Sequence, residues 1–145
     1  MADSIVSAPD VEQLAQSFSG PLLRDGDDGY DEARRVWNGT FDRRPALIAR
    51  CEGVGDVQAA LRFATAAGLP VAVRGGGHSV QGYGSWDDAV VIDLSPMRGV
   101  TVDPDGRTVR AQGGTTWARA VRRSGSTVTT RIGERSMTTA SSHDP

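Results

Sequence analysis

The alternation of apolar and polar positions predicts a short helix near the start of the chain. In PDVEQLAQSF, residues 9–18, apolar residues recur at helical spacing, with Asp10 as the expected N-cap and Gln13 completing a capping box. Residues 24–45, RDGDDGYDEARRVWNGTFDRRP, are polar and rich in turn-forming residues. We therefore expect a surface excursion there, with one helical turn around DEARRVW, residues 31–37.

The middle of the chain has the pattern of a strand, a helix and a second strand. ALIA, residues 46–49, and VAVR, residues 71–74, are short apolar runs typical of buried strands. The helix between them is expected to begin near Asp56 and to stop at Gly68. Such a βαβ unit has parallel strands and a right-handed crossover. The apolar stripe expected on the helix consists of Val57, Ala60, Leu61 and Ala64.

Two further patterns complete the expected fold. AVVIDL, residues 89–94, predicts a third apolar strand, and residues 99–114 predict an antiparallel hairpin. The hairpin turn is DPDG, in which Pro104 suits the second turn position and Gly106 can adopt a positive φ. The order of these elements predicts an α+β fold, in which a small parallel βαβ sheet precedes an antiparallel hairpin.

The last 24 residues differ in composition from the rest of the chain. They contain ten serine or threonine residues and few apolar ones. Such a segment buries too little apolar area to offset the entropy of ordering it, so we expect a loose tail. We accordingly divide the chain into an N-terminal helix and surface segment (1–41), a central domain (42–121) and this tail (122–145).

Composition and charge narrow the possible partners. The length of 145 residues suits about one domain, and the net charge of −2 favours neither nucleic acid nor an anionic membrane. Cys51 is the single cysteine, so no internal disulfide can form. The first residues lack the basic and apolar regions of a secretory signal, and no run reaches the ~20 apolar residues of a membrane helix. We expect a cytoplasmic protein without a nucleic-acid or membrane partner.

The sequence RGGGHS, residues 74–79, directly follows the predicted strand VAVR. Its simplest interpretation is an ordinary turn, and it matches neither G-x-G-x-x-G nor the lysine-containing phosphate loop. However, ligands of open α/β sheets bind at the carboxyl ends of parallel strands, and consecutive glycine amides can form a concave anion site. Arg74 could add a positive charge and Ser79 a hydroxyl, while Gly82 and Gly84 extend the glycine-rich path. These features together favour a site for an anion such as a diphosphate.

His78 could serve this site as a general base, a metal ligand or a nucleophile. A metal site is not expected, because the other histidine is His143 in the tail and Cys51 alone adds little. The adjacent Asp87 and Asp88 are expected to be solvated rather than catalytic.

Residues 42–117 resemble the N-terminal part of the FAD-binding domain of FAD-linked oxidases. This is the superfamily of vanillyl-alcohol oxidase and p-cresol methylhydroxylase, and the chain is most similar to its berberine-bridge-enzyme-like branch. The resemblance rests on RP-x-x-I-x-x-C, the start of the helix after it, VRGGGHS, VIDLS-x-M and the hairpin V-D-P…A-Q-G-G. It implies that the glycine loop surrounds the FAD diphosphate.

The resemblance also implies roles for individual residues. His78 matches the histidine that, in many members, is bonded to the 8α-methyl carbon of the flavin. Trp37 and Asn38 match a stretch near the start of the family's domain, and Cys51 is expected to be a core residue rather than a second flavin anchor. The residues expected to bind the cofactor FAD are Arg74, Gly75, Gly76, Gly77, His78, Ser79 and Gly82.

The resemblance ends after Trp117, where the family continues into the rest of the flavin domain and a substrate domain. Family members oxidise an alcohol, a sugar or a similar small organic substrate by hydride transfer to FAD. We therefore expect an N-terminal fragment of such an enzyme, inactive alone, whose altered last residues reflect a frameshift or premature stop. The alternative is a non-catalytic remnant or a small anion- or nucleotide-binding module.

Overall fold

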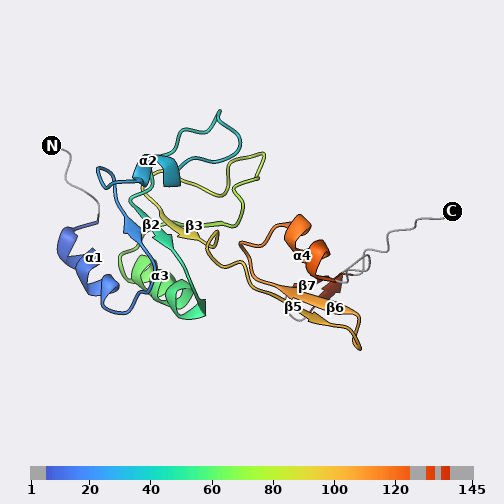
Figure 1. Ribbon diagram of the computed structural model, residues 1–145. Helices are drawn as coiled ribbons and strands as arrows, with labels where there is room; N and C mark the ends of the chain where they lie inside the picture. Colours follow the sequence, from blue (N-terminus) through green and yellow to red (C-terminus); the bar gives the residue numbers. More distant parts are fainter. Residues whose placement is uncertain (1–5, 125–129, 133–134, 138–145) are drawn as a thin grey trace. The chain divides into compact units, whose positions relative to one another are not determined.

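The computed structural model describes residues 6–124, 130–132 and 135–137. The chain forms two compact units, residues 1–97 and residues 98–145 (Figure 1). Within the described part of the chain, no helix has the length and apolar character needed to cross a bilayer.

The first unit is a four-stranded mixed sheet with helices on it. The strand order is β1-β2-β4-β3, in which β2 and β3 both run parallel to β4 while β1 runs antiparallel to β2. The predicted parallel βαβ unit is therefore present, but β4 lies between its two strands. The elements are α1 (Ala8–Ala15), β1 (Leu22–Leu23), α2 (Tyr30–Ala33), β2 (Leu47–Arg50), α3 (Val54–Ala66), β3 (Val71–Arg74) and β4 (Val90–Asp93).

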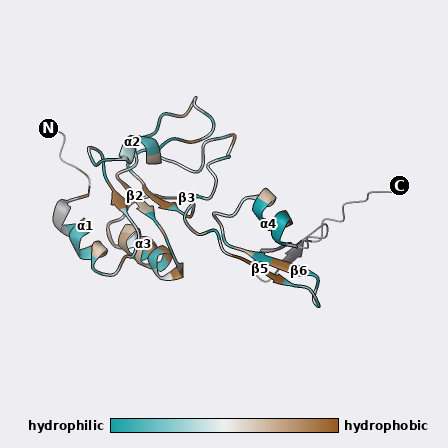
Figure 2. Cartoon of the chain, viewed as in Figure 1, coloured by the Kyte–Doolittle hydropathy of each residue, from teal (hydrophilic) through white to brown (hydrophobic). Residues whose placement is uncertain are grey.

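The strands are apolar, as their colours in Figure 2 show, and α1 and α3 cover one face of the sheet. Leu47 and Val90 on that face pack with Val11 and Leu14 of α1 and with the alanines of α3. The opposite face carries Ile48, Ala72 and Val91, and α2 covers it (Figure 1). The sheet is thus buried on both faces, as expected for parallel strands.

The segment 24–45 is not only a surface segment, because part of it is buried against the sheet. It contains the single expected helical turn, but Tyr30 of that turn is 1% exposed and packs on Ile48 and Val91 of the sheet. The Tyr30 hydroxyl donates to the Pro45 carbonyl at 2.7 Å. Burial, followed by the charge of Asp25, raises the pKa of Tyr30 to about 12. The expectation of a purely surface segment was wrong, because this segment supplies the cover for the second face of the sheet.

Two details of the predicted helices were also wrong. Ser7, not Asp10, caps α1, since the Ser7 hydroxyl accepts from the Asp10 amide. In α3 the side chain of Leu61 is 49% exposed, and the buried stripe is made by Ala59, Ala60 and Ala64. Small residues let the helix lie close to the sheet, so the large leucine is turned outwards. Gly68 does end the helix, with a φ of +66°.

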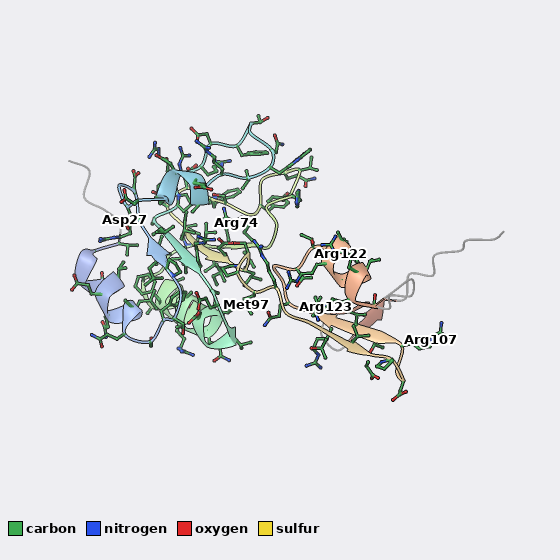
Figure 3. All side chains as sticks on the ribbon, in the orientation of Figure 1. Asp27, Arg74, Met97, Arg107, Arg122 and Arg123 are labelled. Carbon is green, nitrogen blue, oxygen red and sulfur yellow. The ribbon has the colours of Figure 1, made fainter. Side chains whose placement is uncertain are left out.

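The second unit begins with the predicted antiparallel hairpin. β5 (Val100–Asp103) pairs with β6 (Thr108–Ala111), and α4 (Trp117–Ser124) packs against both strands. Gly106 does not have the predicted positive φ; Arg107, at the hairpin tip in Figure 3, has it instead, with a φ of +49°. β7 (Thr130–Ile132) pairs parallel with β6, and β8 (Arg135–Met137) pairs antiparallel with β7.

The α+β fold class is confirmed, with a sheet that contains parallel strands followed by an antiparallel hairpin. Within the predicted loose tail, residues 122–124 belong to the end of α4, and β7 and β8 are two short strands. The rest of that prediction lies outside the described residues.

Candidate functional site

The glycine loop begins where β3 ends, at the carboxyl end of the parallel strands. β3 and β4 are paired up to Arg74 and Asp93, and β2 reaches the same row at Arg50. Residues 75–77 then form a bend, and the chain continues without regular structure to residue 79. The loop therefore lies at the edge of the sheet where open α/β folds place their ligands.

The amides of this loop have no partners inside the described chain. In residues 6–124, no carbonyl or side chain accepts from the N–H groups of Gly75, Gly76, Gly77 or His78. Farther along the chain, the Gly82 amide donates to the Ser79 carbonyl at 3.1 Å. Four consecutive unbonded donors can bind the oxygens of an anion.

The two central glycines have different steric reasons for lacking a side chain. A Cβ at Gly76 would lie 2.7 Å from Cδ2 of the His78 imidazole, so the ring occupies the space that a side chain would need. Gly77 has a φ of +71°, in the left-handed region that L-residues with a Cβ rarely adopt. Its carbonyl accepts from the Trp37 amide at 3.0 Å. The loop is therefore built for close backbone approach.

His78 is exposed to solvent next to these amides. The Trp37 ring lies beside it, with a ring centroid 6.4 Å from that of His78 and the two planes tilted by 48°. The Trp37 side chain is itself 69% exposed. An imidazole in this setting can reach a ligand whose charged part is held by the loop.

Arg74 lies at the start of the loop, but its charge is used within the protein (Figure 3). The residue is 7% exposed, and Nη2 lies 2.9 Å from Oδ2 of the buried Asp93. Nη1 donates to the carbonyls of Ala33 and Arg35. The prediction that Arg74 binds cofactor stays a prediction, and the geometry gives its guanidinium a different set of partners from the one expected.

Ser79 and Gly82 organise the second half of the loop. The Ser79 hydroxyl accepts from the Tyr83 amide at 3.1 Å. Gly82 has a φ of +72°, and a Cβ there would lie 2.6 Å from Cγ of the Phe41 ring. Both residues are needed for the path of the chain, whatever they contribute to a ligand.

A segment between α2 and β2 holds the glycine loop through two hydrogen bonds. Besides the bond between the Trp37 amide and Gly77, Asn38 Nδ2 donates to the Val80 carbonyl at 2.9 Å. We call residues 36–41 the clamp segment. Sequence reasoning singled out Trp37 and Asn38 only through family resemblance, and it missed that they hold the loop, because the pairing spans about forty residues of chain.

The remaining candidate groups have structural roles. Cys51 is fully buried, and burial followed by the charges of Asp56 and Asp93 raises the pKa of its thiol to about 12. Asp87 accepts from the Arg44 amide and from Arg43 Nη1, both at 2.7 Å. In the described part of the chain, no three histidine, cysteine or acidic residues are grouped so that they could hold a metal ion.

The arrangement fits a dinucleotide with a diphosphate bridge. Four amides without partners supply donors for the bridge, the absence of side chains at 75–77 allows contact, and the exposed imidazole is adjacent.

Comparisons with known proteins agree with this geometry. The chain matches the family described as FAD binding domain over residues 45–139. It is 39% identical over 98 residues to (R)-6-hydroxynicotine oxidase of Paenarthrobacter nicotinovorans, covering 68% of this chain and 21% of the relative. It is 37% identical over 75 residues to berberine bridge enzyme-like 18 of Arabidopsis thaliana, covering 50% of this chain and 14% of the relative.

Solved structures give the same picture. The crystal structure of 6-hydroxy-D-nicotine oxidase from Arthrobacter nicotinovorans superposes with a TM-score of 0.72 at 34% identity, covering 81% of this chain and 25% of that one. Xylooligosaccharide oxidase from Myceliophthora thermophila superposes with a TM-score of 0.71 at 25% identity, covering 80% of this chain and 25% of that one. The chain thus spans between 14% and 25% of the length of these relatives.

Proposed function

The chain belongs to the family of FAD binding domains, and we propose on this basis that it forms the part of a flavin-dependent oxidoreductase that binds the FAD diphosphate. The observation that carries the proposal is the run of four unbonded amides from Gly75 to His78 at the carboxyl end of the parallel strands. Backbone donors bind a diphosphate without a lysine, because the hydrogen bonds themselves supply the attraction.

Different residues of the chain would bind the cofactor and hold the loop that binds it. The amides of residues 75–78 would bind the diphosphate, while the clamp segment keeps the loop in place through Gly77 and Val80. The Trp37 ring beside His78 would shield one side of the ligand from water. When bound, FAD supplies a hydride acceptor.

We further propose that His78 is the residue through which the flavin is covalently attached. Its exposed imidazole, next to the amides, supports this role. Attachment would join an imidazole nitrogen to the 8α-carbon of the flavin, and the imidazole proton, one methyl proton and two electrons would pass to dissolved dioxygen, giving hydrogen peroxide. A covalent bond would retain the cofactor even when the protein unfolds.

The substrate class and the activity of the chain alone are also proposals. The relatives are named as oxidases of hydroxynicotine and xylooligosaccharides, which supports a small organic substrate such as an amine, an alcohol or a sugar. Among the described residues, the candidate site has donors for a diphosphate and an imidazole, but no further base for substrate deprotonation. We propose that these 145 residues hold FAD without oxidising such a substrate.

Acid denaturation followed by gel electrophoresis tests the attachment. The purified chain, incubated with FAD, should give a band that fluoresces under ultraviolet light, and His78→Ala should abolish it. His143→Ala is the matched control, because it removes the other histidine, and should leave the fluorescence unchanged. Fluorescence that persists in His78→Ala would contradict the role of His78.

Two further outcomes separate the parts of the proposal. A protein that is yellow when native but loses its flavin in acid binds FAD without the covalent bond. A protein that stays colourless and shows no FAD binding in a titration contradicts the proposed function and favours a small anion-binding module, which would still bind inorganic pyrophosphate. Oxygen uptake with amines, alcohols or sugars would overturn the proposed inactivity.

A further inference from the structure

Three charged residues form one row at the carboxyl ends of the parallel strands. The register places Arg50 of β2 and Arg74 of β3 on either side of Asp93 of β4. Arg74 Nη2 lies 2.9 Å and Arg50 Nε 3.4 Å from Oδ2 of Asp93. The two sides are unequal, because the Arg50 side chain is 40% exposed and its Nε has no hydrogen-bond partner in the described chain.

Asp93 is fully engaged. Its side chain is 1% exposed, and besides Arg74 it accepts from the amide and the hydroxyl of Ser95, both at 3.0 Å. A buried carboxylate with this set of donors is held in one orientation. It therefore fixes the position of the Arg74 guanidinium.

The aliphatic part of Arg74 forms the floor of the glycine loop. A Cβ at Gly77 would lie 3.6 Å from Arg74 Cδ, and a Cβ at Gly84 would lie 3.4 Å from Arg74 Cγ. Gly77 and Gly84 thus both lie against the Arg74 side chain. The same guanidinium donates to the carbonyls of Ala33 and Arg35, just before the clamp segment.

We propose that Arg74 and Asp93 are positioning residues, which hold the glycine loop and the clamp segment in the arrangement that leaves the loop amides open. In this role the Arg74 guanidinium does not contact the diphosphate. The inference rests on the proposed function, because it assigns the anion to the backbone and the charged pair to the support beneath it.

Asp93→Asn distinguishes this role from direct phosphate binding, because the two roles predict different changes in FAD affinity. If Arg74 bound the phosphates, neutralising its carboxylate partner would leave a freer guanidinium and maintain or strengthen FAD binding. If Arg74 positions the loop, the change breaks a buried pair and should weaken FAD binding about tenfold or more. Asp25→Asn is the matched control, since it makes the same chemical change in an exposed pair with Arg44 and should leave binding unchanged.

Arg74→Lys is the second variant, chosen because it keeps the charge and most of the aliphatic stem in case Asp93→Asn folds poorly. Lysine cannot donate to Asp93 and to two carbonyls through a rigid fork, so FAD binding should fall, by less than in Asp93→Asn. Arg50→Lys, on the other side of the same carboxylate, should have no effect on binding. Equal loss in Arg50→Lys and Arg74→Lys would overturn the proposal.

Hydrogen exchange of the peptide covering residues 75–84 provides a readout that does not depend on the cofactor. Without FAD, this peptide should exchange faster in Asp93→Asn and Arg74→Lys than in wild type and in both controls, at temperatures where far-ultraviolet circular dichroism shows all five proteins folded. Unchanged exchange would overturn the positioning role. Failure of the wild type to bind FAD, together with the expected exchange pattern, would overturn only the proposed function.

Discussion

Two loops of this protein follow a strand and contain glycine, but they differ in the hydrogen bonding of their backbone amides. In the hairpin turn between β5 and β6, the Gly106 amide donates to Asp103 Oδ1 at 2.9 Å, and the Arg107 amide donates to the Pro104 carbonyl at 3.3 Å. In the glycine loop after β3, the amides of residues 75–78 have no such acceptors in residues 6–124. The hairpin turn is closed on itself, whereas the glycine loop is open.

The difference separates glycine used for turning from glycine used for contact. The hairpin turn needs only to reverse the chain, and an aspartate side chain satisfies its donors. The glycine loop has a charged and buried support beneath it, but that support leaves the amides free. Within this loop Gly76 and His78 are exposed, so water can satisfy their amides in the absence of ligand, and the same donors are available to an anion.

Among substitutions in these two loops, the largest expected effect comes from Gly76→Ala. The new Cβ would lie 2.7 Å from the His78 imidazole, so the ring must move away from the loop amides. We expect FAD binding to weaken about tenfold, equivalent to about 1.4 kcal/mol. Isothermal titration with FAD measures this.

Gly55→Ala is the control for this change, because a Cβ at Gly55 meets no atom within 4 Å. Its FAD affinity should equal that of wild type. If Gly76→Ala also binds like wild type, the loop does not require close backbone approach at this position.

The second prediction compares two glycines with positive φ. Gly77 (φ +71°) lies in the loop, while Gly68 (φ +66°) ends α3. Replacing either with alanine forces a side chain into the left-handed region, so each should lower the free energy of unfolding by about 1 kcal/mol. Chemical denaturation measures that cost, and only Gly77→Ala should also weaken FAD binding. Equal binding by the two variants would show that Gly77 serves the fold alone.

These comparisons also indicate what the sequence could predict. Local patterns were sufficient for the central strands, for α3 with its stop at Gly68, and for the hairpin between β5 and β6. The glycine triplet after an apolar run indicated an open loop, because three glycines fit neither a helix nor a strand. Local signals succeed where the physical cause lies within a few residues.

Features that depend on distant contacts could not be predicted in this way. The row of Arg50, Asp93 and Arg74 exists because β4 pairs between β2 and β3, which no local spacing encodes. Arg74 was therefore expected to offer its charge to a ligand. Similarly, the polar segment around Tyr30 looked like surface, because the face it covers belongs to strands that come later in the chain.

The third prediction concerns the closed turn. Asp103→Ala removes the acceptor of the Gly106 amide, and should lower the stability of the second unit by about 0.5–1.5 kcal/mol, the usual net contribution of such a bond. FAD titration should give the wild-type affinity, because the glycine loop is untouched. A drop in affinity without a drop in thermal stability would mean that the two loops are not independent.

The smallest expected effect is a pH dependence at Asp87, just beyond the glycine loop. The Arg44 amide, and then Arg43, hold the pKa of this carboxyl below its ordinary value of 3.8. A lowered pKa stabilises the folded state well above pH 3.8, and this contribution is lost as the pH falls below that value. Because the side chain is 47% exposed, solvent screening keeps the effect below about 1 kcal/mol.

Asp87→Asn should therefore reduce thermal stability slightly at pH 7 and make no difference near pH 2. Melting curves at both pH values measure this. A stability difference that grows towards low pH would contradict the lowered pKa of the Asp87 carboxyl.

The clamp segment has a practical consequence for anyone who shortens this protein. The family match begins at residue 45, after the tryptophan and asparagine whose bonds hold Gly77 and Val80. A version trimmed to start at Pro45 would retain every residue of the glycine motif but lose the clamp segment. Such a version would also lose α1, β1 and α2, so it should be less stable and bind flavin poorly. Domain boundaries drawn from sequence similarity alone would therefore discard part of the binding apparatus.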